Sequence, residues 1–177
     1  MRSLPLAALI GGLSFLAASQ ANAAYIDPAT NQIFARGGNV SVRFVSKTAS
    51  HSDNIVSLRD NSVVLNNQTA APGAIFNIGA FSPGELIAFR MDDLRSRRSY
   101  FTGLASLNFD LMVHALLSLN ADGSIRVGFE DLSKRVSDLD YDDVVFDVIE
   151  TPLPGALPLL VSGLLGLGYA ARRRRKA

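Results

Sequence analysis

The sequence predicts an all-β domain, a β-sandwich of jelly-roll type, between two apolar segments at the chain ends. Three observations support this. Short apolar segments recur at regular spacing, and Gly, Pro and Asn separate them. Residues 40–45 and 124–130 alternate apolar and polar side chains, as half-buried strands do. Long apolar runs occupy only residues 4–18 and 155–171.

The first 23 residues are typical of a signal peptide. Arg2 gives a positive start, the run 4–18 is apolar apart from Ser14, and small residues stand at Ala21 and Ala23. The run is short for a membrane anchor and a cleavage site follows it. We therefore expect export and removal of residues 1–23.

The strands of the first half follow a turn at 37–39. Val40, Val42 and Phe44 share one face of the first strand. The break at 59–61 predicts a hairpin, and Ser82-Pro83-Gly84 predicts a turn. The expected strands are 40–45, 55–58, 62–66, 74–81 and 85–91.

The second half follows the same pattern. The turn at 120–123 precedes a strand whose inward residues are Ile125, Val127 and Phe129. Periodicity alone leaves a helical turn open for 111–119. The expected strands are 99–108, 111–120, 124–130 and 142–149. Together these segments form one domain, residues 24–150.

The last 27 residues, 151–177, have three parts. Prolines mark a break from the domain, and residues 155–171 form an uncharged run that would span ~26 Å as a helix. We expect a single membrane helix here, with the domain outside the cell because basic residues stay on the cytoplasmic side. The basic end consists of Arg172, Arg173, Arg174, Arg175 and Lys176.

This tail resembles the PEP-CTERM sorting signal of Gram-negative bacteria. The matching motif is Thr151 followed by Pro152, Leu153, Pro154 and Gly155. The resemblance implies an exosortase-like processing enzyme as partner. It also implies a precursor anchored in the inner membrane, then release to the outer surface or the extracellular space.

The charge of the exported part differs from that of the whole chain. Removing Arg2 and the five terminal cations from 17 leaves 11 basic residues against 16 acidic ones. This acidic balance excludes a general nucleic-acid binder. The chain has no Cys, so disulfides and thiolate chemistry are excluded as well.

Catalysis has little support in the sequence. His51 lies in a polar loop and His114 in an apolar segment, where a packed, hydrogen-bonded histidine is expected. No nucleophile elbow is present. Paired carboxylates leave a hydrolase open, but the chain has no Trp to line a sugar cleft. A carbohydrate-binding module on the same fold is the other alternative.

The segment 129–148 concentrates carboxylates in one turn. Oxygen ligands at alternate positions suit Ca²⁺, which takes about 6–8 oxygens. An EF-hand is excluded, because Asp143 stands where that loop needs Gly and Ile149 where it needs Glu. A calcium site in a β-sandwich turn, or a self-capped turn, remains. The first-choice ligands are Asp138, Asp140, Asp142 and Asp143, and the second-choice ligands are Glu130 and Asp131.

The same segment resembles an uncharacterised domain of exported bacterial proteins. The matching stretches are 128–132, Gly-Phe-Glu-Asp-Leu, and 138–146, which fits an Asp-x-Asp-Tyr-Asp-Asp-Val-Val-Phe signature. The resemblance implies an extracellular β-domain with a suspected calcium site and no established activity. We therefore expect an exported, non-enzymatic protein of the cell surface or biofilm matrix, possible partners being extracellular polysaccharides.

Overall fold

The computed structural model describes residues 23–152 and residue 164. The expected signal peptide, the membrane helix 155–171, the basic end and most of the sorting motif lie outside the described residues. Among the described residues, no helix has the length and apolar character to span a bilayer. Residues 21–154 form one compact unit.

The described part is all-β, as the sequence predicts. It contains twelve strands and one short 3₁₀ helix, η1 (Ala105–Leu107). The strands are β1 (Tyr25–Asp27), β2 (Gln32–Phe34), β3 (Gly38–Ser46), β4 (Asp53–Ser57), β5 (Val63–Asn66), β6 (Ile75–Phe81), β7 (Leu86–Ile87), β8 (Phe89–Asp93), β9 (Arg98–Phe101), β10 (Ala115–Leu119), β11 (Ile125–Phe129) and β12 (Val144–Pro152).

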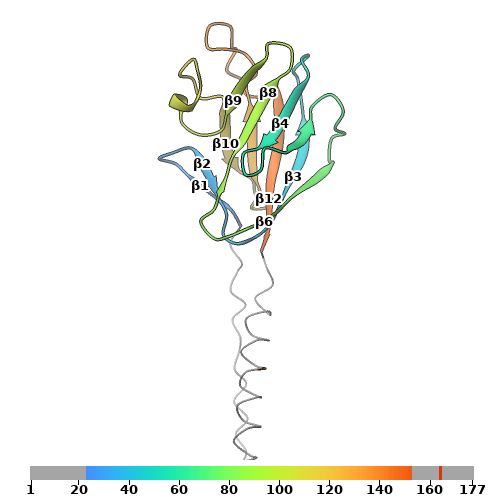
Figure 1. Ribbon diagram of the computed structural model, residues 1–177, viewed down its shortest axis with the longest axis vertical. Coiled ribbons are helices and arrows are strands. Elements are labelled where there is room, and N and C mark those ends of the chain that lie inside the picture. The colour runs from blue at the N-terminus through green and yellow to red at the C-terminus, as the bar shows by residue number, and fades with distance from the viewer. Residues whose placement is uncertain (1–22, 153–163, 165–177) are drawn as a thin grey trace, which may run out of the picture. The chain divides into compact units, whose positions relative to one another are not determined.

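These strands form three antiparallel sheets (Figure 1). The largest has the order β10-β11-β12-β3-β6, and the second has the order β5-β4-β8-β9. A small sheet, β1-β2-β7, completes the fold. In the largest sheet β12 is the central strand, and β3 and β11 pair along its two sides.

The core lies between the inner faces of the sheets. Val144, Phe146 and Val148, at alternate positions of β12, are each at most 1 % exposed and belong to the core cluster. Phe146 meets Phe89 of β8 edge-to-face, with ring centroids 5.1 Å apart. Burying each such ring contributes roughly 1.5–3 kcal/mol. These aromatic contacts therefore join the five-stranded sheet to the four-stranded one.

The outer face of β12 is held by an ionic network around Asp147. Asp147 is 0 % exposed, and its carboxylate accepts hydrogen bonds from Arg43 Nη2 at 2.7 Å, Arg126 Nε at 3.0 Å and Asn120 Nδ2 at 2.9 Å. Burial alone would raise its pKa, but these bonds outweigh burial and hold the pKa below its ordinary value. Asp147 is thus a satisfied structural carboxylate.

Two observed strands are shorter than the segments predicted for them. The segment 99–108 is a strand only to Phe101, because Gly103 has a φ of 111° and Asn108 folds back. The Asn108 side chain accepts the Phe101 N–H at 2.8 Å and donates to the Met112 carbonyl at 2.9 Å. The segment 111–120 becomes strand only at Ala115, and the helical alternative is wrong.

Candidate metal centre

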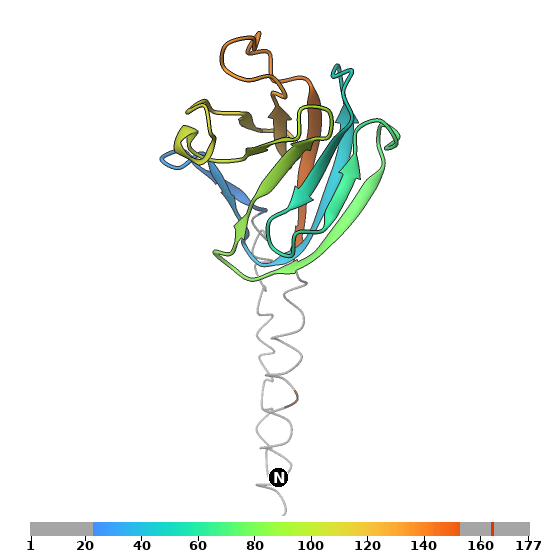
Figure 2. The same cartoon turned by 45° about the horizontal axis from the view of Figure 1, so that its top comes forward.

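The candidate site lies where β11 ends and β12 begins. Phe129 of β11 pairs with Val144 of β12. The residues just beyond this pair, Glu130 and Asp131 on one side and Asp143 on the other, are therefore neighbours in space. The intervening loop projects from one end of the sheets, orange-brown in Figure 2.

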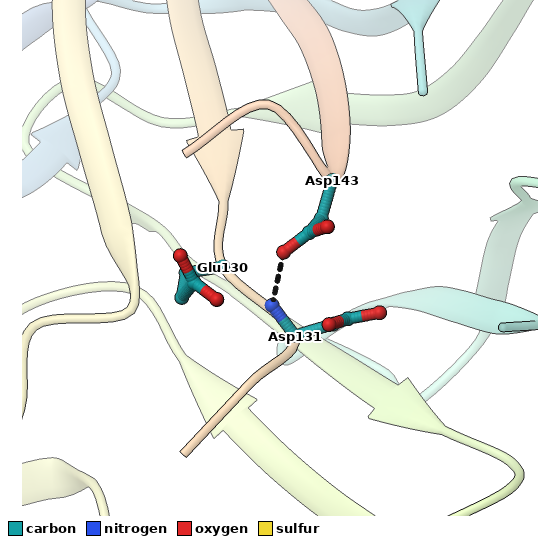
Figure 3. Close-up of side chains that lie close together, drawn as sticks. All are labelled: Glu130, Asp131 and Asp143. Atoms are coloured by element: carbon teal, nitrogen blue, oxygen red, sulfur yellow. Dashed lines mark hydrogen bonds between the residues drawn. The ribbon is translucent and has the colours of Figure 1, made fainter. Parts of the chain in front are cut away.

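Three carboxylates converge at this end (Figure 3). Glu130, Asp131 and Asp143 each offer an oxygen, and these oxygens lie within 4.8 Å of one another. Asp143 Oδ2 also accepts the Asp131 N–H at 2.8 Å, which fixes the spacing of the two aspartates. Such separations allow oxygens to share one cation with Ca–O distances of about 2.3–2.6 Å.

A second group shares Glu130 with the first. Oxygens of Glu130, Asp138 and Asp140 also lie within 4.8 Å of one another. The loop turns sharply here, since Leu139 and Tyr141 have φ values of 60° and 55°. We call the five residues the carboxylate cluster: Glu130, Asp131, Asp138, Asp140 and Asp143.

Glu130 is the residue common to both groups, and it is 0 % exposed. Its Oε1 accepts the Leu132 N–H at 3.1 Å, whereas its Oε2 is buried and has no hydrogen-bond partner among the described residues. Leaving a buried ionised oxygen unpaired costs free energy. Burial, followed by the charge of Asp143, raises the pKa of Glu130 to about 7, although interactions with the Ser137 side chain and the Leu132 N–H oppose the shift.

The neighbouring aspartates are perturbed in the same direction. Asp131 is 5 % exposed, and burial followed by the charge of Asp143 raises its pKa to about 7. The pKa of Asp143 is raised as well, mainly by burial, although the Asp131 N–H opposes the shift. The buried carboxylates thus lack neighbouring positive charge. Either bound protons or a bound cation would relieve the repulsion between them.

Asp142 belongs to neither group. Its side chain accepts a hydrogen bond from Thr48 Oγ1 at 2.5 Å, and its N–H donates to Asp140 Oδ1 at 3.2 Å. The Thr48 N–H donates to the Asp142 carbonyl at 3.2 Å. Of the six predicted ligands, five therefore gather in the cluster, and Asp142 ties the loop to residue 48.

The four-stranded sheet brings acidic residues that sequence analysis missed. Asp53 and Asp93 face each other across β4 and β8. Asp53 is 0 % exposed and its Oδ1 has no hydrogen-bond partner among the described residues. Burial, then the charge of Asp93, raises its pKa to about 6. Asp53 begins β4 and Asp93 ends β8, and no metal-binding motif in the local sequence distinguishes either residue.

His51 lies between the two sheets' acidic ends. Its Nδ1 is 3.5 Å from Asp93 Oδ2 and 3.8 Å from Asp131 Oδ2. Arg95 Nη1 is 2.9 Å from the other ring nitrogen, Nε2. Acidic side chains of β4, β8 and the β11–β12 loop therefore meet in one region. The imidazole of His51 lies beside two of these acids, Asp93 and Asp131.

His114 is packed and hydrogen-bonded, as predicted. It is 0 % exposed, its Nδ1 is 2.9 Å from the Glu130 carbonyl oxygen, and its Nε2 is 3.1 Å from both Asp110 carboxylate oxygens. Its Nδ1 thus contacts the backbone of Glu130, while its Nε2 contacts Asp110. None of these partners is a hydroxyl that the imidazole could activate.

A comparison with protein-family models identifies the family of this chain. Residues 15–151 match a domain of unknown function, DUF4114, and the chain belongs to that family. Neither a curated protein nor a solved structure matches the chain.

Proposed function

We propose that this protein is an exported, non-enzymatic domain of the cell surface or extracellular matrix whose loop end is stabilised by Ca²⁺. The observation that carries the proposal is Glu130, buried and shared by both carboxylate groups, with Oε2 unpartnered among the described residues. A hard cation beside Glu130 would take its oxygen together with those of Asp131 and Asp143, and the second group, Asp138 and Asp140, adjoins the same residue. Extracellular calcium modules fill at Kd values of about 10⁻⁴–10⁻³ M.

The fold supports a β-sandwich as the scaffold of this function. The five-stranded and four-stranded sheets bury their aromatic residues against each other, with Phe89 against Phe146. The cluster joins loops from one end of both sheets, since Asp131 lies within 3.8 Å of His51, just before β4. A cation there would tie the two layers together at their loop end.

Thermal melting of the compact unit, residues 21–154, tests the proposal. Ca²⁺ at ten times its Kd stabilises the folded state by about 1.4 kcal/mol. We expect Tm to rise by about 3–6 °C between EDTA and millimolar Ca²⁺. An unchanged Tm would reject the calcium site.

Two variants sharpen the test. Glu130→Gln removes the shared charge while keeping the shape of the side chain, so we expect the calcium-dependent rise to disappear. Its Tm in EDTA should not fall, because a buried unpaired charge is gone. Asp142→Asn is the matched control, since Asp142 lies outside the cluster, and it should keep the full rise. Loss of the rise in both variants would contradict the assignment of ligands.

A further inference from the structure

A cavity of about 440 Å³ lies beside the β11–β12 loop, apart from the carboxylate cluster. This volume is within the range of about 300–1,000 Å³ that small-molecule sites occupy. The lining residues are Arg98, Phe109, Asp110, Ser133, Lys134 and Arg135. Three cations thus surround one cavity of a domain that is acidic as a whole.

Four of the nine arginines in the described domain form ion pairs with acids, Arg59 with Glu85 among them. Arg43, Arg90 and Arg126 form ion pairs with aspartates. Among the described residues, no ion pair joins Arg98, Lys134 or Arg135 to an acid. Their charge is therefore available to a ligand.

Asp110, the one acid in the lining, has other partners. Its carboxylate accepts the Lys134 N–H at 2.9 Å and the Met112 N–H at 3.2 Å, and it contacts His114 Nε2 at 3.1 Å. Although burial raises the pKa of Asp110, these contacts outweigh it and lower the pKa overall. Asp110 thus fixes the backbone that carries Lys134, and leaves the cavity with an excess of positive charge.

Phe109 adds an apolar surface to the cavity. Its side chain is 59 % exposed, and the Arg98 guanidinium lies 4.9 Å from the ring centroid. An aromatic ring packs against the C–H face of a sugar, while guanidinium and ammonium groups bind carboxylate or sulfate oxygens. A cavity with both an aromatic ring and cations should therefore bind an acidic sugar more tightly than a simple anion, which has no sugar ring to contact Phe109.

From these contacts we propose that the cavity binds an acidic saccharide, a sugar that carries a carboxylate or a sulfate group. Arg98 and the pair Lys134 and Arg135 contact the anionic group, and Phe109 contacts the sugar ring. The proposal concerns a different surface from the calcium site. It holds or fails independently of the ligands assigned to the cluster.

Binding of short labelled oligosaccharides to the 21–154 unit tests this proposal. The probes are trigalacturonate, a sulfated galactose trisaccharide, a neutral galactose trisaccharide and inorganic phosphate, all at the same millimolar calcium concentration. We expect at least one acidic trisaccharide to bind at least ten-fold more tightly than the neutral one and phosphate. The comparison of trigalacturonate with the sulfated probe decides which group is recognised. Equal binding of the neutral probe, or of phosphate, would overturn the proposal.

Matched double variants assign the binding to the cavity. Lys134→Ala with Arg135→Ala should weaken binding of the acidic trisaccharide at least ten-fold without changing Tm in calcium, because both side chains are exposed. Arg36→Ala with Lys47→Ala removes the same charge from exposed positions elsewhere and should leave binding unchanged. If both doubles weaken binding equally, the effect is general charge attraction and the cavity is not the site.

Discussion

Glu130 shows how the environment of one residue decides its chemistry. Sequence spacing made it a second-choice ligand, since it stands eight residues before Asp138. In the fold it is the member shared by both carboxylate groups. Its burial, which follows from β11 ending under the loop, is a tertiary property that no local pattern records.

The raised pKa values predict an unusual pH dependence for the calcium-free protein. Folding raises the pKa of Glu130 from 4.5 to about 7, of Asp131 from 3.8 to about 7 and of Asp53 from 3.8 to about 6. The folded state then binds more protons than the unfolded state between about pH 4 and 7, so stability falls as pH rises through that window. We expect a lower Tm at pH 8 than at pH 5 in EDTA.

Calcium should remove most of this difference, because a bound cation favours the ionised carboxylates. Melting curves at pH 5 and pH 8, in EDTA and in calcium, measure both effects. The variant Glu130→Gln should reduce the fall seen in EDTA. A Tm in EDTA that rises from pH 5 to pH 8 would contradict the buried, charge-deficient cluster.

At the scale of elements, Gly128 of β11 determines where the loop can lie. A Cβ at this position would lie 2.2 Å from the carbonyl oxygen of Tyr141, which belongs to the backbone of the β11–β12 loop. The Tyr141 hydroxyl fixes the same loop by donating to the Val113 carbonyl at 3.1 Å. The close approach of strand and loop therefore requires glycine.

The variant Gly128→Ala should displace residues 138–141 from the cluster. We expect a loss of about 1–3 kcal/mol in the free energy of unfolding, as overpacking typically costs, and a much smaller calcium-dependent rise in Tm. Denaturant unfolding in EDTA and in calcium measures the two effects. Gly84→Ala is the control for a loss of stability alone: its positive φ of 78° strains an alanine, but a Cβ there meets no atom within 4 Å and lies away from the cluster. An equal loss of calcium response in both variants would contradict this role of Gly128.

The elements were predictable where alternation was strong. The inward residues Val40, Val42 and Phe44 of β3 are all at most 1 % exposed, and the hairpin of β4 and β5 is present. The strands β1 and β2 were not predicted, because each has only three residues. β7 and β8 read as one strand in sequence, yet β7 pairs with β2 and β8 with β4.

The candidate site was predictable only where its residues are close together in the sequence. A dense acidic turn is visible in sequence, so the loop itself could be found. Asp53, Asp93 and His51 reach it through strand pairing and the packing of the sheets. Nothing in the local sequence around these three residues indicates such contacts. Asp142 lies outside the cluster because its side chain bonds to Thr48, a contact that the sequence does not reveal either.

At the scale of the whole molecule, the domain ends inside the proposed sorting motif. β12 continues through Pro152, and its last residues, Thr151 and Pro152, pair with Asn39 and Gly38 of β3. A processing enzyme needs unpaired backbone, so the proposed cut must lie beyond Pro152. We expect intact-mass spectrometry of the secreted protein to place its C-terminus at residues 153–155. A mature protein that retains Arg172–Arg175 would contradict processing of the tail.

The position of β12 also has a mechanical consequence. One end of this strand adjoins Asp143 of the cluster, and the other end, Pro152, leads into the tail. Tension between an anchored tail and a ligand held at the loop end would run along the length of β12. Its hydrogen bonds to β11 and β3 would then be loaded in shear and resist together, whereas an edge strand peels away bond by bond. In the proposed anchored precursor, before the tail is cut, the central place of β12 would let the domain resist tension between its tail and its loop end.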